Sequence, residues 1–500
     1  MKKGKVWLVG AGPSDFGLLT IKGKKAIENA DVIFYDRLVS HSIVNLAKDD
    51  ATLIDVGKRS KNHTMPQEEI NELLLKYALQ GKNVVRLKGG DPFLFGRGGE
   101  ELELLVQNNV DFEVVNGITS AIAVPAYNGI PVTHRDFVSS LHIITGHTKD
   151  ENDNKIDFKS LVNLKGTLVF LMGVSYLQNI CNGLLNAGMD KNIPVAILEK
   201  GTTANQRIIK GTLNNIYEKS ISQKAKTPAI IVVGKVCDLY EKFEWKSKLP
   251  LSKATILVTR PKDVSSSFCE MLRENGADVI DMPVIKTVAL QNDNIKNTFE
   301  NLDFNYIVFT SPKGVECFFN NMKHYKKDIR TLFNKKIAVV GNVTKKALEE
   351  KGFFVDCMPE KYCGKELGLK LIQQINKNDK ILIARAKDGN QDIVNILKQN
   401  NVNFKDLALY ETVYEKANFI NYSFSYDDIV TFTSASTVIG FVNSVKEYDL
   451  DFTKIKAVCI GKQTEEQALK YGFKTVVSNE ATLDSMVEKI INLCKEGQNE

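Results

Sequence analysis

The stretch VVRLKGGDPFLFGRGGEE, residues 84–101, decides how the first half of the chain is interpreted. It opens as a short apolar strand and then breaks into a loop that contains five glycines and one proline. Glycine pairs allow a backbone or a ligand to approach where a Cβ atom would clash. The stretch therefore predicts a buried strand whose carboxyl end carries a close-approach site, with Asp91 and Arg97 beside the glycine pair.

Length and composition indicate a globular protein of several domains. The chain has 500 residues, of which 43% are hydrophobic and 25% charged, and domains usually contain about 100–200 residues, so we expect two or three units. No apolar run approaches the roughly 18 residues that span a bilayer. The first residues, MKKGKVWLVGAG, reach their glycines too early for a signal peptide. We therefore interpret them as a core strand and expect a cytoplasmic protein.

The cysteines argue against a metal site, and the net charge does not identify a class of ligand. Eight cysteines are scattered without a CxxC motif and without a histidine at zinc-binding spacing, so we expect reduced side chains and no metal site. The net charge of +6 carries no basic tail. It suits an anionic small molecule as well as weak contact with nucleic acid, and composition alone does not choose between them.

Short β-rich runs alternate with amphipathic helical stretches along the whole chain, which predicts α/β layers. Examples are DVIFYD, TLVFLMG, YIVFTS and KIAVVG. A boundary is predicted near residues 245–253, where a charged stretch precedes a fresh strand, TILVTR. In the second half, TSPKGVECF (310–318) is echoed by TSASTVIGF (433–441). This repeat predicts two lobes of related topology, although chance similarity between α/β units is the alternative.

The segment VGAGPSD, residues 9–15, resembles a dinucleotide-binding loop, and Asp36 stands where a ribose-binding acid is expected. The residue types argue against that interpretation. Asp15 would present a negative charge to a pyrophosphate, and Pro13 removes one N–H donor. The loop is better suited to a ligand without phosphate.

Nine segments of the first half together resemble the uroporphyrinogen-III C-methyltransferases of the tetrapyrrole methylase family. They are GAGPSD, YDRLVS, VGKR, PQEEIN, VRLKGGDPFLFGRGGEE, GIPVTHRD, TGH, LVFLMG and TPAIIVVGKV, and they cover about residues 4–246. The resemblance implies transfer of methyl groups from S-adenosylmethionine (SAM) to two carbons of uroporphyrinogen III, which gives precorrin-2. No dehydrogenase or chelatase segment precedes residue 4, so we expect another protein to oxidise precorrin-2.

The resemblance also implies roles for individual residues. Asp36 matches the proton acceptor and Lys58 the proton donor, although positioning a substrate carboxylate would explain this lysine equally well. The positions that match SAM contacts are Pro13, Gly89, Gly90, Asp91, Leu94, Thr119, Ser120, Met172, Gly201, Thr227 and Ala229. The positions that match substrate contacts are Arg37, Arg97, Glu100 and Arg135. Arginines suit a substrate with eight carboxylates, because each binds a carboxylate through two parallel hydrogen bonds.

Two positions depart from the family pattern. Ser14 replaces a glycine, so the freedom to adopt a positive φ is lost, and we expect a turn with negative φ. Asn116 replaces a proline before Gly117. These departures affect the geometry of the loops and the affinity for the cofactor, and leave the proposed chemistry intact.

The second half, from about residue 253 to 493, resembles uroporphyrinogen-III synthase. The matching segments are LVTRP, VFTSPKGVECF, VVGNVTKKALEEKGF, ILIARAKDGNQDIVNIL, LYETVY and TFTSASTV. The resemblance implies cyclisation of hydroxymethylbilane to uroporphyrinogen III with inversion of the last ring, without a cofactor. Tyr410 matches a tyrosine that assists departure of the hydroxyl, and could equally be an amphipathic strand-end tyrosine. Positions that match substrate contacts are Thr310, Ser311, Thr433 and Ser434, although serines and threonines there also suit helix caps.

The predicted architecture is an N-terminal two-lobed tetrapyrrole methylase domain, residues 1–246, followed by a two-lobed α/β synthase domain with parallel sheets, residues 253–500. Its first lobe is expected at about 253–288 plus 415–500, and its second at about 289–414. We expect a bifunctional enzyme on the way to sirohaem or cobalamin, without nucleic-acid or membrane partners, that dimerises through the methylase domain. The alternatives are a methyltransferase with a C-terminal tetrapyrrole-binding or regulatory module, and a methylase with another substrate.

Overall fold

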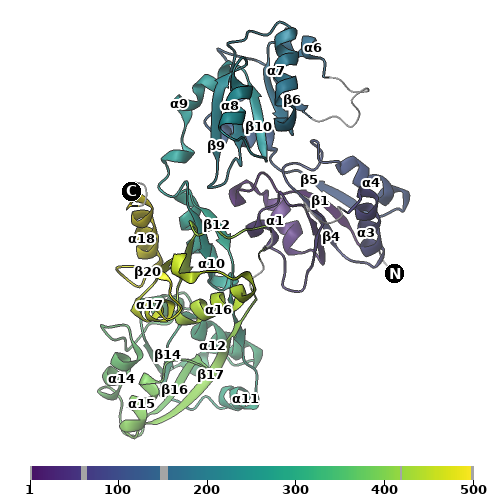
Figure 1. The fold of residues 1–500 in the computed structure, drawn as a ribbon. Helices are drawn as coiled ribbons and strands as arrows, with labels where there is room; N and C mark the ends of the chain where they lie inside the picture. The colour runs from purple at the N-terminus through teal and green to yellow at the C-terminus, as the bar shows by residue number, and fades with distance from the viewer. Residues whose placement is uncertain (1–2, 58–64, 147–155, 417–418, 420, 497–500) are drawn as a thin grey trace. The chain divides into compact units, whose positions relative to one another are not determined.

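The computed structural model describes residues 3–57, 65–146, 156–416, 419 and 421–496 (Figure 1). The chain divides into two compact units. Unit 1 comprises Met1–Met282, Ala417–Phe441 and Val445–Glu500, and unit 2 comprises Pro283–Lys416 and Val442–Ser444. The described residues form five-stranded sheets, three in unit 1 and one in unit 2.

The first sheet of unit 1 is entirely parallel. Its strand order is β3 (Thr52–Asp55), β2 (Val32–Tyr35), β4 (Val84–Lys88), β1 (Val6–Gly10) and β5 (Phe112–Val115). Helices α3 (Gln67–Leu79) and α4 (Gly98–Gln107) pack on one face through Leu74, Leu102 and Leu105. Figure 1 shows both helices beside β1 and β4. Because the strands share one direction, the loops that follow them lie at the same edge.

The second sheet of unit 1 is mixed. Its order is β6 (Leu141–Thr145), β7 (Thr167–Leu171), β10 (Ala229–Val233), β8 (Pro194–Glu199) and β9 (Arg207–Thr212). Strand β10 is antiparallel to both β7 and β8, so its first residue lies at the edge where those two strands end. Helix α5 (Ser120–Tyr127) contributes Ala121 and Val124 to the core of one face. Helices α7 (Leu177–Asn186) and α8 (Ile216–Ser222) cover the other face.

The third sheet of unit 1 is again parallel, in the order β12 (Asp278–Asp281), β11 (Thr255–Val258), β18 (Ile429–Phe432), β19 (Lys456–Cys459) and β20 (Lys474–Val477). Helices α10 (Lys262–Glu274) and α18 (Leu483–Glu496) pack Phe268, Leu272 and Met486 into one core. Helices α16 (Ala435–Val445) and α17 (Lys462–Leu469) follow β18 and β19.

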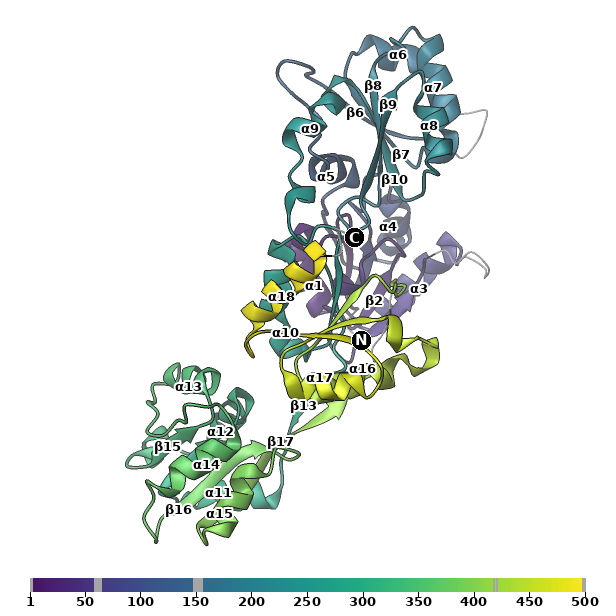
Figure 2. The same ribbon diagram turned by 60° about the vertical axis from the view of Figure 1, so that its left-hand side comes forward.

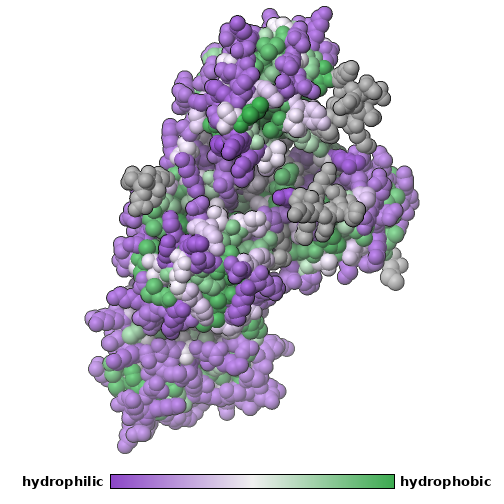
Figure 3. Space-filling model, viewed as in Figure 1, coloured by the Kyte–Doolittle hydropathy of each residue, from purple (hydrophilic) through white to green (hydrophobic). Residues whose placement is uncertain are grey.

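Unit 2 holds the remaining sheet, in the order β13 (Ile285–Ala289), β17 (Asn403–Tyr414), β16 (Lys380–Ala386), β14 (Tyr306–Phe309) and β15 (Lys336–Val339). It is parallel except for β13, which pairs antiparallel with β17. Helices α11 (Asp293–Glu300) and α12 (Pro312–His324) supply one core, and α14 (Gly364–Ile372) and α15 (Asp392–Gln399) supply the other. The long β17 and the neighbouring β16 are visible in Figure 2. The viewed face of this unit is mostly hydrophilic (Figure 3).

The strand runs predicted from the sequence are confirmed. The runs named above form β2, β7, β11, β14 and β15. The two echoing segments each follow a strand and begin a helix, so β14–α12–β15 followed by α13 (Asn342–Glu349) has the same order as β18–α16–β19–α17. Within the described ranges, no helix has the length and apolarity needed to cross a membrane.

Candidate functional site

Three glycine loops meet backbone to backbone at the edge of the first sheet. Gly12 and Gly90 exchange N–H···O=C hydrogen bonds of 3.2 and 3.0 Å, and both have positive φ angles, +71° and +69°. A Cβ atom on Gly117 would lie 2.1 Å from the carbonyl oxygen of Gly90. The glycines after β1, β4 and β5 therefore allow the protein's own backbone to close this edge.

One side of Gly90 stays open. A Cβ atom there would find only the backbone nitrogen of Ser120 within 4 Å, at 3.9 Å. Thr119 caps α5 by accepting a hydrogen bond of 3.3 Å from the N–H of Ala121. The surface beside Gly90 thus combines bare backbone with the amino end of a helix. These uncharged donors and acceptors fit the hydroxyls and the carboxylate of a SAM molecule.

Asp91 holds two of these loops together. Its Oδ1 accepts from the N–H of Phe93 at 2.8 Å, and its Oδ2 accepts from the N–H of Gly117 and from Asn116 Nδ2, both at 3.1 Å. The asparagine that departs from the family pattern therefore supplies a hydrogen bond that proline cannot make.

The loop after β1 differs from the prediction at one residue. Ser14 has a φ of +74°, so the expected turn with negative φ is wrong. Neighbouring contacts hold the loop in this strained conformation. Asp15 accepts hydrogen bonds from the N–H of Gly17 at 2.7 Å and from Tyr127 Oη at 2.9 Å, and Thr202 Oγ1 donates to the carbonyl of Pro13.

The cofactor positions predicted in the second sheet lie at one edge. Met172 follows β7 with a φ of +55° and is 54% exposed, and Gly201 follows β8. Thr227 precedes β10 and Ala229 is its first residue, and Ala229 pairs with Glu199 at the end of β8. A Cβ atom on Gly201 would lie 2.3 Å from Val124 Cγ1 of α5, so the glycine allows close packing. Leu94, in the loop after β4, is half-buried.

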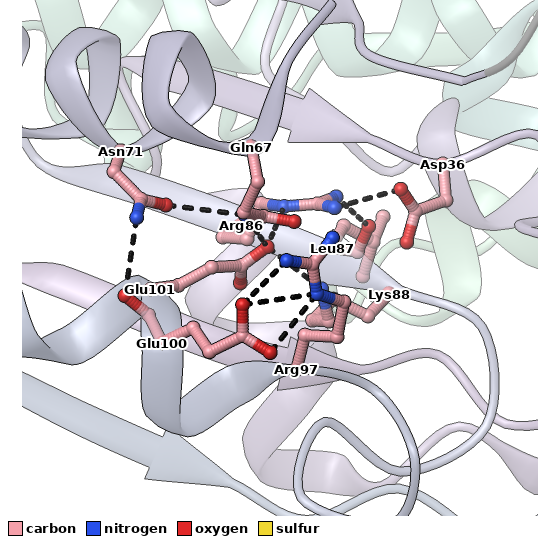
Figure 4. Close-up of polar contacts among 9 residues, drawn as sticks. All are labelled: Asp36, Gln67, Asn71, Arg86, Leu87, Lys88, Arg97, Glu100 and Glu101. Atoms are coloured by element: carbon pink, nitrogen blue, oxygen red, sulfur yellow. Dashed lines mark hydrogen bonds and ion pairs between the residues drawn. The ribbon is translucent and has the colours of Figure 1, made fainter. Parts of the chain in front are cut away.

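Asp36 directly follows β2 and belongs to an ionic network with residues of β4 and α4 (Figure 4). Its Oδ1 accepts from Arg86 Nη2 at 2.7 Å. Glu101 Oε1 accepts from Arg86 Nε at 3.1 Å and from Lys88 Nζ at 2.8 Å. No role was predicted from the sequence for Arg86, Lys88 or Glu101. Their signal was available, because two cations alternate along an otherwise apolar strand and so point to the same face.

The predicted substrate-contact residues of this half are exposed. Arg97 and Glu100 form an ion pair with each other, with Nε 3.0 Å from Oε1, at the start of α4. Glu100 also raises the pKa of Arg97 through this hydrogen bond. Arg37 and Arg135 lie on exposed loops. Lys58 lies outside the described residues.

In unit 2, Tyr410 and Ser311 form a pair of hydroxyls at the junction of β17 and α12. Tyr410 is 8% exposed, its Oη lies 2.7 Å from Ser311 Oγ, and burial raises its pKa. Ser311 is the N-cap of α12 and accepts from the N–H of Gly314 at 3.0 Å. Its own proton is then free to point at Tyr410, which would leave the tyrosine O–H to donate elsewhere.

The other synthase positions also stand at helix amino ends. Ser434 and Thr437 form a capping box at the start of α16, with both N–H···Oγ distances at 3.2 Å. Thr310 and Thr433 precede the two capping serines and are half-buried. Among the described residues, no group of three or more histidine, cysteine or acidic side chains is placed to hold a metal ion.

Comparisons with known proteins give the same division of the chain. Residues 5–217 match the family model of the tetrapyrrole (corrin/porphyrin) methylases, and residues 266–488 match that of uroporphyrinogen-III synthase HemD. The porphyrin biosynthesis protein HemD of Ruminiclostridium josui is 48% identical over 99% of both chains. The uroporphyrinogen-III C-methyltransferase of Bacillus subtilis is 42% identical over 71% of this chain and 73% of its own length.

A solved structure resembles the first half. The uroporphyrin-III C-methyltransferase of Thermus thermophilus, crystallised with S-adenosylhomocysteine, is 36% identical with a TM-score of 0.41, and the match covers 47% of this chain and all of that one. The two family models and the full-length relative assign each half of the chain to a family. The chain belongs to the tetrapyrrole methylase family through its N-terminal half and to the uroporphyrinogen-III synthase family through its C-terminal half.

Proposed function

We propose that this chain catalyses two consecutive steps of tetrapyrrole biosynthesis. Residues 253–500 cyclise hydroxymethylbilane to uroporphyrinogen III with inversion of the last ring. Residues 1–246 then methylate this product twice, with SAM as donor, to give precorrin-2 for sirohaem or cobalamin. The observation that carries the proposal is the backbone-lined edge at Gly12, Gly90 and Gly117, with Asp36 at the end of a strand of the same sheet.

The methyl-transfer half needs three things from the protein. SAM supplies a methyl group on a sulfonium sulfur, and the bare backbone at Gly90 with the amino end of α5 would bind and orient it. A pyrrole carbon that accepts a methyl group must lose a proton, and Asp36 would take it with its Oδ2 atom. Exposed arginines, Arg37, Arg97 and Arg135, would bind the substrate's carboxylates, and Glu100 orients Arg97. Lys58 would either donate a proton or hold a carboxylate.

The synthase half would act mainly by holding its substrate. Loss of the terminal hydroxyl as water leaves an electrophilic azafulvene, and the O–H of Tyr410 would assist that departure. Ser311 keeps the tyrosine oriented through the 2.7 Å hydrogen bond. The amino end of α12 in unit 2, with Thr310 beside it, would bind carboxylates, and so would the amino end of α16 in unit 1, with Thr433 beside it.

Two further features are part of the proposal. The chain would assemble as a homodimer through the methylase domain. It would act in the cytoplasm, a reducing compartment that suits eight cysteines of which none forms a disulfide within the described ranges.

A second candidate is a methyltransferase whose C-terminal half binds tetrapyrroles without turnover. One observation favours it: the hydroxyls of Ser311 and Ser434 already cap helices. Both candidates keep the methyl transfer and differ only in the cyclisation.

The decisive experiment incubates the purified chain with hydroxymethylbilane, with and without SAM, then oxidises and separates the products. Uroporphyrin III without SAM, and a dimethylated product with it, are expected. Formation of the type I isomer alone, at the spontaneous rate, would leave only the second candidate. Uroporphyrinogen III supplied directly tests the methyltransferase by itself, and no methylated product would refute it.

A further inference from the structure

The carboxylate of Asp36 is held on one side only. Its Oδ1 accepts the 2.7 Å hydrogen bond from Arg86 Nη2, whereas Oδ2 has no hydrogen-bond partner among the described residues. The side chain is 29% exposed. One oxygen is therefore anchored to the sheet, and the other remains available for a proton.

Arg86 makes this anchor rigid, because its guanidinium is bound on three sides (Figure 4). Nη2 donates to Asp36 just after β2, Nε donates to Glu101 on α4 at 3.1 Å, and Nη1 donates to the carbonyl of Leu87 on β4 at 3.1 Å. The side chain is 3% exposed. A planar fork that is fixed at three points and buried cannot turn without breaking hydrogen bonds.

Glu101 in turn fixes Arg86. This carboxylate is fully buried, and its Oε1 accepts from Arg86, from Lys88 Nζ and from Gln67 Nε2 of α3, the last at 3.1 Å. Its Oε2 has no partner among the described residues. The positive charges of Arg86 and Lys88 balance the negative charges of Asp36 and Glu101. Donors from α3 and β4 together hold Glu101 Oε1 in place.

The charges also keep Arg86 ionised. Burial opposes the charge on Arg86, but Asp36 and Glu101 outweigh it and raise its pKa. Burial and the neighbouring arginine lower the pKa of Lys88. Arg86 therefore keeps its protons, and its Nη2 remains a donor to Asp36.

Stability alone does not explain such a network. Apolar side chains of similar volume are often at least as stabilising as buried ion pairs, since charges lose their hydration. The same face of the sheet is apolar elsewhere, through Val6, Phe34 and Val84. Within β4, the buried charges are Arg86 and Lys88, in the half of the strand that leads to the same edge as Asp36.

We propose that Arg86 and Glu101 are positioning residues for Asp36. Glu101 orients Arg86, and Arg86 fixes Oδ1 so that Oδ2 meets the proton that leaves the methylated carbon. This inference rests on the proposed methyl transfer, with Asp36 as the base.

The test replaces Arg86 by lysine, which keeps the positive charge but cannot bridge both carboxylates. In Arg86→Lys, kcat for methylation of supplied uroporphyrinogen III is expected to fall about 10- to 100-fold, as for a misplaced catalytic group. KM and the calorimetric affinity for S-adenosylhomocysteine should stay within about twofold, since neither ligand is bound by Asp36 Oδ1 in the proposal.

Arg385→Lys is the matched control. Arg385 is equally buried and donates from Nε and Nη2 to Asp406, both at 2.7 Å, but it lies in unit 2. This variant should leave methyl transfer unchanged. An equal kcat loss in both variants would overturn the proposal, as would an unchanged kcat in Arg86→Lys.

A double-variant cycle separates positioning from packing. In the Asp36→Asn background, Arg86→Lys should have no further effect on single-turnover methylation, because the carboxylate it orients is gone. The same fold loss in both backgrounds would show that Arg86 acts elsewhere. If Arg86→Lys does not fold, Glu101→Gln replaces it, with an expected loss of about 3- to 10-fold in kcat at unchanged KM. Absence of methylation by the wild-type chain would refute the proposed function instead.

Discussion

The two candidate sites of this chain are built from opposite kinds of side chain. At the edge of the first sheet, Asp36 is anchored by a buried network of two cations and two carboxylates. In unit 2, Tyr410 contacts the neutral hydroxyl of Ser311 at the amino end of α12. The first site fixes a full charge in place, whereas the second presents hydroxyls and backbone N–H groups.

Under the proposed function, this difference follows from what each reaction requires of the protein. Methylation of a pyrrole carbon produces a proton, and a carboxylate that is ionised and correctly oriented is required to remove it. Ring closure after loss of water creates its own electrophile, so the protein chiefly has to hold a flexible polyanion in one conformation. Under this proposal, a fixed charge would serve the first task, and helix amino ends would serve the second.

The largest effect is expected when the proposed base, Asp36, is removed from the methylation site. Asp36→Asn should lower kcat for methylation about 10²- to 10⁴-fold, the usual contribution of a general base. Formation of uroporphyrinogen III should be unchanged. Both activities are measured separately by supplying either substrate.

Asp31→Asn is the control for this variant. Asp31 stands just before the same strand, at its opposite end, and forms a 2.7 Å ion pair with Lys48. Loss of such a surface pair costs about 0–1 kcal/mol of stability and should leave kcat unchanged. Equal effects of the two substitutions would contradict the role of Asp36.

The second prediction concerns stability. Glu101→Leu leaves Arg86 and Lys88 buried without their shared carboxylate, so the free energy of unfolding should fall by about 3–5 kcal/mol. Denaturant unfolding followed by tryptophan fluorescence reports this change, because Trp7 of β1 pairs with Val85 of β4. Glu103→Leu, on the exposed face of the same helix, should change it by less than about 0.5 kcal/mol.

The third prediction concerns the hydroxyl pair of Tyr410 and Ser311. Tyr410→Phe removes one hydroxyl and should lower the rate of uroporphyrinogen III formation about tenfold, which corresponds to one hydrogen bond. Methylation of supplied uroporphyrinogen III should be unaffected. An unchanged rate of cyclisation would show that the hydroxyl of Tyr410 does not assist the reaction.

Much of the fold was predictable from the sequence because its signals are local. Apolar runs that end in glycine, serine or threonine become strands, and the echo of 310–318 by 433–441 becomes the shared β–α–β–α order. The antiparallel pairing of β13 with β17 was not predicted, because the residues of β13, IKTVA, do not indicate whether the strand pairs parallel or antiparallel.

Only those site residues that belong to a recognisable sequence motif were predictable. The resemblance supplied Asp36 and the glycine loop, but the network around Asp36 joins residues 36, 67, 86, 88 and 101, which only the folded sheet brings together. The positive φ of Ser14 was also missed, because the hydrogen bonds around Asp15 and Pro13 that stabilise it are tertiary contacts.

The prediction with the smallest expected effect distinguishes two roles of Ser434, capping of α16 and contact with substrate. Ser434→Ala removes the cap of α16 and should cost about 1 kcal/mol of stability. Ser434→Asp keeps a capping oxygen, so stability should be retained, but its negative charge would repel a polycarboxylate at the helix end. A raised KM for hydroxymethylbilane in the aspartate variant, at wild-type stability, would therefore place substrate at α16. An unchanged KM would make Ser434 a cap alone, and would leave substrate binding in this half to α12 and Tyr410.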